Sequence, residues 1–148
     1  MGHIIREAEC SDLKSMILLL RVLFSIEKDF KADEDKQQRG LELMLEDCSN
    51  RCLMVAELEQ RIIGMCTAQI LVSTAEGGIA ALIEDLVVEE AYRGQGIGKE
   101  LVLAVESWAI VRGAKRLQLL ADRNNTRGLG FYKKMGWKFT QLICLQKK

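Results

Sequence analysis

The sequence predicts an α/β (α+β) fold, in which amphipathic helices are interspersed with strands. Apolar residues recur at intervals of three and four positions between residues 13 and 24, which is the period of an α-helix. Other apolar runs have the length of strands and end at glycine or polar turns, as at residues 79–88. The chain has no proline and no low-complexity tract. We therefore expect one uninterrupted series of helices and strands.

Each element has its own local signal. A short strand at residues 4–6 opens the chain, and a helix follows with Met16, Leu20 and Phe24 on one face. A second helix is predicted from Glu34 to Glu46. Polar turns at residues 59–61 and 76–78 separate the next three strands, and Gly113 ends the third helix because glycine favours the position after a helix. The later elements are strands at 52–58, 62–72 and 79–88, a helix at 97–112, a strand at 116–121, a helix at 125–135 and a closing strand at 137–145.

Length and composition limit the possible functions. A chain of 148 residues can bury the core of one domain, which we expect to span residues 1–148. Basic and acidic residues balance at 21 each, so we expect no nucleic-acid or membrane partner. The N-terminus does not resemble a signal peptide. The five cysteines include no C-x-x-C pair, which indicates reduced thiols in a cytoplasmic protein, and no metal site is expected.

A glycine-rich turn, Tyr92-Arg-Gly-Gln-Gly-Ile-Gly-Lys99, connects the strand at 79–88 to the helix at 97–112. The first N–H groups of such a helix lack intrahelical partners and lie at the positive end of its dipole. Glycines without a Cβ let a phosphate approach the backbone closely. Residues 93–99 are therefore a candidate phosphate-binding loop, which we call the cradle. The alternative is a flexible helix start that binds nothing.

The spacing of the glycines distinguishes between phosphate ligands. A dinucleotide fingerprint needs G-x-G-x-x-G, whereas the glycines here alternate. A P-loop needs Ser or Thr after its lysine, but Glu100 follows Lys99. The pattern Arg93-x-x-Gly96-x-Gly98 instead resembles the acetyl-CoA pyrophosphate loop of the GNAT superfamily of N-acetyltransferases.

A second segment also resembles this superfamily. Asn125, Tyr132 and the pair Gly136-Trp137 fit its later signature. Gly128 and Gly130 depart from the usual helix formers there, and each costs up to ~1 kcal/mol of helix propensity. The resemblance covers residues 3–145. It implies a GNAT-type mixed, mainly antiparallel sheet flanked by helices on both faces.

The resemblance implies acetyl-CoA as co-substrate. Its pyrophosphate is expected on the amides of residues 95–99, and its pantetheine arm beside residues 86–88, where a backbone N–H could bind the oxyanion. The implied cofactor-binding residues are Leu86, Val87, Val88, Arg93, Gly94, Gln95, Gly96, Ile97, Gly98, Lys99 and Asn125.

Three residues are candidate catalytic groups. Tyr132 stays protonated at neutral pH and can donate a hydrogen bond to the leaving sulfur. Glu84 and Asp85 interrupt an apolar strand, where charges are costly unless they are paired or functional. Because neighbouring strand residues point to opposite faces, we expect one of them to reach the acceptor. We favour Glu84 as base and Asp85 as amine anchor, and simple ion pairing is the alternative.

The acceptor is expected to be a small cationic amine. Acidic residues cluster around Phe24 and Phe30, and the predicted substrate-binding residues are Phe24, Glu27 and Asp33. A solvated acidic face is the alternative for each of these charges. Two other functions stay open: a protein or peptide N-acetyltransferase, which would need an open groove, and a non-catalytic acyl-CoA-binding module. Apolar residues in the closing strand predict a homodimer.

Overall fold

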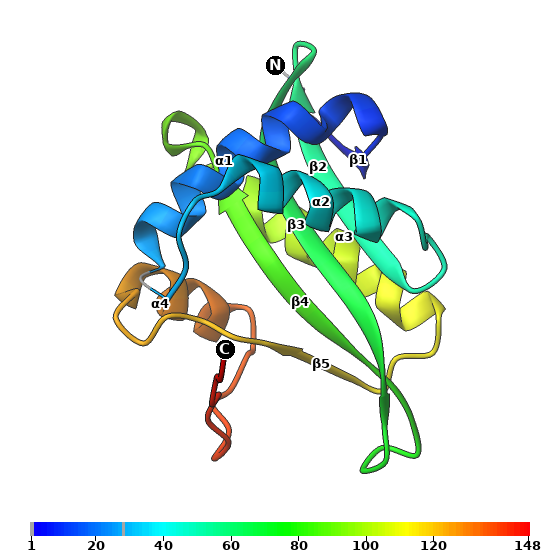
Figure 1. The fold of residues 1–148 in the computed structure, drawn as a ribbon. Coiled ribbons are helices and arrows are strands. Elements are labelled where there is room, and N and C mark those ends of the chain that lie inside the picture. The colour runs from blue at the N-terminus through cyan, green and yellow to red at the C-terminus, as the bar shows by residue number, and fades with distance from the viewer. Residues whose placement is uncertain (1, 28) are drawn as a thin grey trace.

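The computed structural model describes residues 2–27 and 29–148, and within these residues it contains a five-stranded sheet and four α-helices (Figure 1). The strands are β1 (Ile4–Glu7), β2 (Arg51–Leu58), β3 (Arg61–Ser73), β4 (Gly78–Val88) and β5 (Arg116–Leu119). The helices are α1 (Leu13–Ile26), α2 (Glu34–Leu45), α3 (Ile97–Val111) and α4 (Thr126–Lys134), with short 3-10 turns η1 (Cys10–Asp12) and η2 (Glu90–Tyr92).

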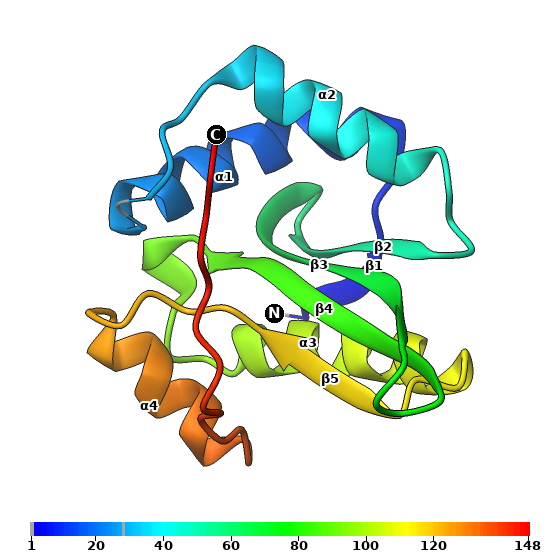
Figure 2. The ribbon, with the colours of Figure 1, turned by 60° about the horizontal axis from the view of Figure 1, so that its bottom comes forward.

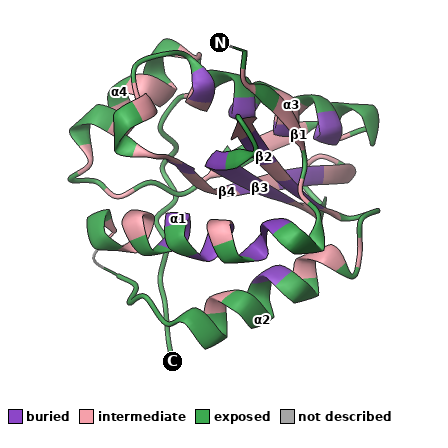
Figure 3. Ribbon diagram, turned by 90° about the horizontal axis from the view of Figure 1, so that it is seen from above, coloured by how far each residue is buried: buried purple, intermediate pink, exposed green. Residues whose placement is uncertain are grey.

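The sheet is mixed and mainly antiparallel, as predicted. Its strands follow the order β1-β2-β3-β4-β5, and only the pair β4–β5 is parallel. Helices α1 and α2 cover one face of the sheet and α3 covers the other (Figures 1 and 3). The expected helices on both faces are therefore confirmed. Among the described residues, no helix has the length and hydropathy needed to cross a bilayer.

Two apolar clusters hold these layers together. Leu101 and Val105 of α3 are fully buried against one face of the sheet. Met16 and Leu20 of α1 are buried against the other face. Truncating a residue of this kind to alanine typically costs ~2–5 kcal/mol. Because β4 lies between the two clusters, its position relative to both helical layers is firmly set.

The pairing of the parallel strands β4 and β5 ends before the C-terminus of β4. Their pairing runs from Ala80 opposite Arg116 to Ile83 opposite Leu119, where β5 ends. Strand β4 continues to Val88. Among the described residues, positions 84–88 therefore have no strand partner on the β5 side, and we call this segment the open edge.

A β-bulge lies within the same segment of β4. The register of β3 and β4 passes from Thr67 opposite Glu84 to Met65 opposite Val87, so Cys66 alone faces two residues of β4. Asp85, the first of these two, has a φ of 54°. A residue other than glycine is strained in this conformation. Such strain, like the bulge itself, is often found near functional sites.

The predicted closing strand at 137–145 is wrong. The chain after α4 forms no regular strand, and it extends toward the side of the sheet that α1 and α2 cover (Figures 2 and 3). Phe139, Leu142, Ile143 and Leu145 are each at least 75% exposed. The apolar pattern had predicted a strand, but a strand also needs a neighbour that satisfies its backbone groups.

Candidate active site

The cradle lies between the end of β4 and the start of α3. Gly94 and Gly96 have φ values of 79° and 85°, in the left-handed region that favours glycine. Gly96 is the N-cap of α3, and no side chain of the described part of the chain caps this helix end. The N–H groups of the first turn thus have no capping side chain, and they form a site of positive potential for an anion.

The cradle can contact a ligand mainly through its backbone. The side chain of Ile97 is buried in the core and anchors the start of α3. The side chains of Gln95 and Lys99 are exposed. The side chain of Arg93 binds back to the protein, because its Nε donates to the carbonyl oxygen of Val88 at 2.9 Å. This bond ties the cradle to the open edge.

The cradle and the open edge together fit acetyl-CoA. The uncapped helix start suits a pyrophosphate. An unpaired strand edge offers alternating N–H and C=O groups to an extended ligand, and the amide groups of pantetheine can pair with them. Residues 86–88 and the cradle are therefore the part of this structure that would hold the co-substrate, whose thioester supplies the acyl group.

The bulge brings both β4 carboxylates into one pocket. A pocket of about 210 Å³ is lined by Phe24, Glu27, Phe30, Glu84, Asp85 and Leu120, and we call it the acceptor pocket. The expectation from strand alternation that Glu84 and Asp85 point to opposite faces is therefore wrong, because both line the same pocket. Regular alternation would separate them, but the extra residue of the bulge turns Asp85 to the same side as Glu84.

The environment raises the pKa of both carboxyl groups. Burial is the main cause for Glu84, and the nearby charge of Asp85 adds to it. Burial also raises the pKa of Asp85, although Thr67 opposes this shift. The Oγ1 atom of Thr67 lies 3.1 Å from Oδ2 of Asp85. Asp85 is therefore fixed in place, whereas Glu84 makes no such side-chain bond among the described residues.

Glu27 adds a third carboxyl group from α1, just past its last helical residue. Burial, followed by the charges of Asp85, Asp122, Glu84 and Asp29, raises the pKa of Glu27 to about 7. Carboxyl groups that crowd together in this way favour protonation or a cationic ligand. The rings of Phe24 and Phe30, whose centroids are 5.7 Å apart, line the same pocket. Aromatic faces also attract cations.

Tyr132 lies on α4, in an aromatic cluster. Its ring contacts Phe131 and Trp137 edge-on, with centroid distances of 5.3 and 6.2 Å. Burial raises the pKa of its phenol, and the proximity of the ionisable groups of Cys66 and Glu27 acts in the same direction. Tyr132 is thus a protonated donor at neutral pH. A Cβ on Gly98 would lie 3.7 Å from the ring of Phe131, so α4 packs beside the cradle.

Two predicted binding residues act as helix caps. The side chain of Asn125 accepts a hydrogen bond from the N–H of Gly128 at 3.0 Å and caps α4. A Cβ on Gly128 would lie 2.5 Å from the Asn125 amide nitrogen, which explains a glycine inside this helix. Asp33 caps α2 by accepting from the N–H of Lys36 at 3.2 Å. Asp33 does not line the acceptor pocket, unlike Phe24 and Glu27.

Two residues of the site were missed from the sequence. Thr67 contacts Asp85, and its polar side chain within the apolar run of β3 was an available signal. Leu120 follows β5 and lines the acceptor pocket. No local pattern marks it, because its place depends on the divergence of β4 and β5.

The fold and the arrangement of the cradle and the open edge agree with the GNAT resemblance of the sequence. A family model described as the acetyltransferase (GNAT) family matches residues 16–137. The chain therefore belongs to this family, and the expected membership is confirmed. Solved structures that share the fold include complexes with CoA and with acetyl-CoA.

Curated relatives match parts of the chain. A thialysine N-epsilon-acetyltransferase from Bos taurus is 37% identical over 54 residues, which are 36% of this chain and 32% of that protein. A glucosamine 6-phosphate N-acetyltransferase from Trypanosoma brucei brucei is 34% identical over 79 residues, which are 53% of this chain and 52% of that protein. The matches thus span a third to a half of these relatives.

A solved structure matches almost the whole chain. It is described as a transcriptional regulator from Bacillus halodurans C-125, and it is 28% identical with a TM-score of 0.86. The match covers 99% of both chains. The fold established by the family match therefore extends over essentially the full chain.

Proposed function

We propose that the protein is an N-acetyltransferase that moves an acetyl group from acetyl-CoA to a small cationic amine, by direct attack in a ternary complex. One observation carries the proposal. Glu27, Glu84 and Asp85 line one pocket next to the open edge of β4. Acetyl transfer needs the acceptor amine and the thioester to meet, and this juxtaposition suits that need. The names of the two curated relatives also give acceptors that carry an amino group.

Binding begins with the protonated amine. The carboxylates of the acceptor pocket attract the cation, and Phe24 and Phe30 offer aromatic faces to it. Asp85 serves as the anchor because Thr67 holds it in position. At the other end of the site, the uncapped start of α3 binds the co-substrate. Arg93 keeps the cradle in place through its bond to Val88.

Glu84 then acts as the base. It accepts a proton from the ammonium group, directly or through a water molecule, so that the nitrogen lone pair can attack the thioester carbonyl. Burial raises the pKa of Glu84, which makes its carboxylate a stronger base than an exposed one. Only the neutral amine attacks, so activity is expected to rise with pH as the acceptor loses its proton.

Backbone and phenol groups assist the later steps. An N–H group among residues 86–88 can stabilise the developing oxyanion, because preorganised donors act in this way in acyl transfer. Tyr132 donates its O–H to the leaving sulfur. Its raised pKa makes complete proton transfer costly, so its main effect is a hydrogen bond that strengthens as charge develops.

One assay separates this function from the alternatives. Thiol release from acetyl-CoA is measured with polyamines, amino acids, aminoglycosides and peptides as acceptors. The small, partly enclosed acceptor pocket favours small amines. Preference for a peptide would establish the protein-directed function instead. Binding of acetyl-CoA without turnover of any acceptor would indicate a non-catalytic binding module.

We also propose that the protein forms a homodimer through its C-terminal segment, residues 138–145. This segment carries four exposed apolar side chains, and among the described residues it pairs with no strand. Strand β5 lies at the end of the sheet order, so one of its edges has no strand partner within the residues that the structure describes. A second copy could satisfy both surfaces.

A cytoplasmic location is the last part of the proposal. Cys10, Cys48, Cys52, Cys66 and Cys144 are all free thiols. Unpaired thiols are typical of proteins from reducing compartments.

A further inference from the structure

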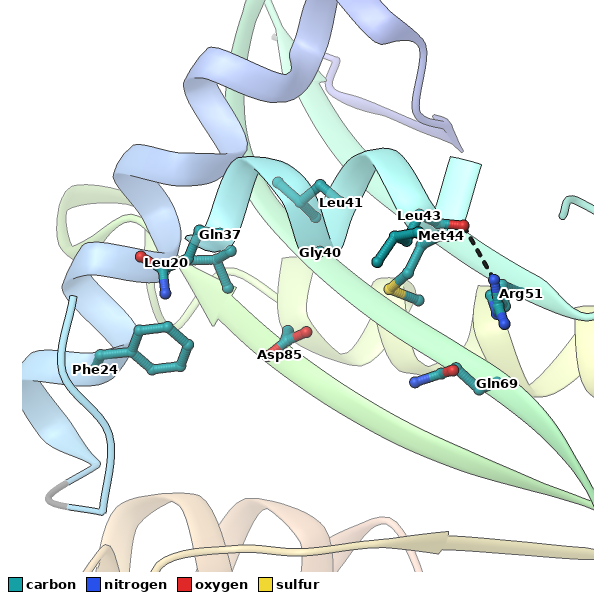
Figure 4. Close-up of a pocket in the computed structure, with 10 residues that line it drawn as sticks. All are labelled: Leu20, Phe24, Gln37, Gly40, Leu41, Leu43, Met44, Arg51, Gln69 and Asp85. Carbon is teal, nitrogen blue, oxygen red and sulfur yellow. Dashed lines mark hydrogen bonds between the residues drawn. The ribbon is translucent and has the colours of Figure 1, made fainter. Parts of the chain in front are cut away.

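A second cavity adjoins the acceptor pocket. It has a volume of about 380 Å³ and lies between helices α1 and α2 and strands β3 and β4 (Figure 4). Phe24 and Asp85 line both this cavity and the acceptor pocket. A ligand whose amino group is held at Asp85 can therefore extend into the second cavity.

The middle of this cavity is apolar. Leu20 of α1 and Leu41 and Met44 of α2 contribute side chains to its wall. Leu20 and Leu41 are also buried in the core, so this wall is firmly positioned. An aliphatic chain is the kind of group that such a wall accommodates.

The far end of the cavity is cationic. Arg51 is the first residue of β2 and lines this end of the cavity. Gln69, which lies opposite Arg51 on β3, lines it too. Nη1 of Arg51 donates to the carbonyl oxygen of Leu43 at 3.0 Å, which leaves Nε and Nη2 without an acceptor among the described residues. Figure 4 shows this bond and places Asp85 and Arg51 at separate points along the cavity.

Arg51 also has no ion-pair partner among residues 2–27 and 29–148. Asp47 lies near Arg51, but its Oδ2 accepts a hydrogen bond from Nδ2 of Asn50 at 3.0 Å instead. A half-buried guanidinium group without a carboxylate partner is suited to binding an anion.

The two charged ends are separated by a span that a small molecule can bridge. Asp85 lies opposite Cys66 on β3, and Arg51 lies opposite Gln69. Their Cα positions are thus ~10 Å apart along the strands and ~10 Å apart across them. The cavity therefore offers a carboxylate, an apolar wall and a guanidinium group in sequence.

We propose that the acceptor carries an anionic group at the end opposite its amine, and that Arg51 binds this group. The inference rests on the proposed N-acetyltransferase function and narrows its substrate class. The acceptor is then an ω-amino acid or a compound of the same charge pattern, with an aliphatic chain along Leu20 and Met44. Arg51 is a specificity-determining residue in this proposal.

Three acceptors with the same carbon chain test the proposal: ω-aminohexanoate, hexylamine and hexanediamine. Values of kcat/KM are measured by thiol release for the wild type, Arg51→Gln and Arg51→Lys. The wild type should prefer ω-aminohexanoate over hexylamine by about tenfold or more, the effect of a hydrogen bond to a charged group. Arg51→Gln should remove this preference, and Arg51→Lys should restore part of it.

Arg39→Gln provides the matched control. Arg39 is exposed on α2 and does not line the cavity, so its loss removes the same charge without touching the site. This variant should keep the wild-type preference. If Arg51 only ties β2 to the end of α2, Arg51→Gln will change kcat/KM equally for all three acceptors.

The possible failures are distinguishable. Turnover of all three amines without preference for ω-aminohexanoate, or preference for hexanediamine, overturns the inference and leaves the N-acetyltransferase function standing. An equal effect of Arg51→Gln and Arg39→Gln on the preference also overturns it. Absence of thiol release with any amine overturns the proposed function and the inference together.

Discussion

The side chains of Thr67 and Asp85 contact each other at the bulge in the pairing of β3 and β4. The Oγ1 atom of Thr67 lies 3.1 Å from Oδ2 of Asp85 and 3.2 Å from the carbonyl oxygen of Glu84. The hydroxyl has one proton, which it can donate to either oxygen. Donation to Asp85 stabilises the ionised carboxylate and lowers its pKa against the effect of burial. Thr67 thus helps to keep the proposed amine anchor charged.

Replacing Thr67 with valine is expected to raise the pKa of Asp85 further, because the carboxylate loses its donor while its burial remains. The acidic limb of the kcat/KM profile should then move to higher pH. Thr67→Ser keeps the hydroxyl and should retain the wild-type limb. Profiles of the three proteins with a fixed amine provide the measurement, and coincident limbs for the valine and serine variants would refute a role for this hydroxyl.

Gly96→Val should weaken acetyl-CoA binding by about tenfold or more. Its φ of 85° is unfavourable for valine by ~1–2 kcal/mol, so the start of α3 must rearrange. The control is Gly113→Val at the other end of the same helix. Gly113 has a φ of 91°, and a Cβ on either glycine would meet no atom within 4 Å.

Both glycine variants should therefore lose similar stability in thermal unfolding, but only Gly96→Val should lose affinity in calorimetric titration. Equal acetyl-CoA affinities for the two variants would show that the cradle does not bind the pyrophosphate.

Tyr132→Phe should lower kcat by about 100-fold, the low end of general acid catalysis, with little change in acetyl-CoA affinity. The ring and its aromatic contacts remain, so the loss reports the hydroxyl alone. Tyr92→Phe makes the same chemical change in the chain's other tyrosine, and it should keep wild-type kcat. Rapid-quench measurement of the chemical step gives the comparison, and an unchanged rate for Tyr132→Phe eliminates it as the donor.

The cradle was predictable because its cause is local. Alternating glycines before an amphipathic helix require only the residues from Arg93 to Lys99 and the helix that follows. The left-handed conformations of Gly94 and Gly96 agree with that prediction. Its ligand contacts, by contrast, stay a prediction.

The arrangement of the carboxylates was not predictable in the same way. Strand alternation placed Glu84 and Asp85 on opposite faces, because nothing in their neighbours requires an extra residue. The bulge depends on the register with β3, where Cys66 faces two residues. Register is a tertiary property, and the strained φ of Asp85 follows from it.

The failure at the C-terminus has a related cause. The apolar pattern of residues 137–145 resembles a strand, but β5 ends after four residues and does not pair with this segment. The exposed segment leads to a prediction about assembly. Light scattering at micromolar concentration is expected to give a dimer for the intact chain. Replacement of Phe139, Leu142, Ile143 and Leu145 by threonine keeps β-propensity but removes the apolar surface, so this variant should be monomeric. A monomeric intact chain would contradict the proposed homodimer.

Glu27 should make amine binding depend on pH near neutrality. Its pKa of about 7 means that the carboxyl group is largely neutral at about pH 6 and largely ionised at about pH 8. The attraction for a cationic amine therefore grows as pH rises, and the apparent KM for the amine should fall by about fivefold across this range, equivalent to ~1 kcal/mol. The KM for acetyl-CoA should stay constant.

Glu27→Gln isolates this effect, because glutamine has a similar shape and no charge at either pH. The variant should keep a high amine KM throughout, without the fall near neutrality. Asp33→Asn is the control: Asp33 caps α2 outside the acceptor pocket, and asparagine is an equally good cap, so this variant should follow the wild-type curve. If Glu27→Gln retains the wild-type pH dependence, the neutral-pH transition belongs to another group and Glu27 does not hold the amine. Loss of the transition in Asp33→Asn as well would instead assign it to the general acidity of this surface, since both substitutions remove one negative charge.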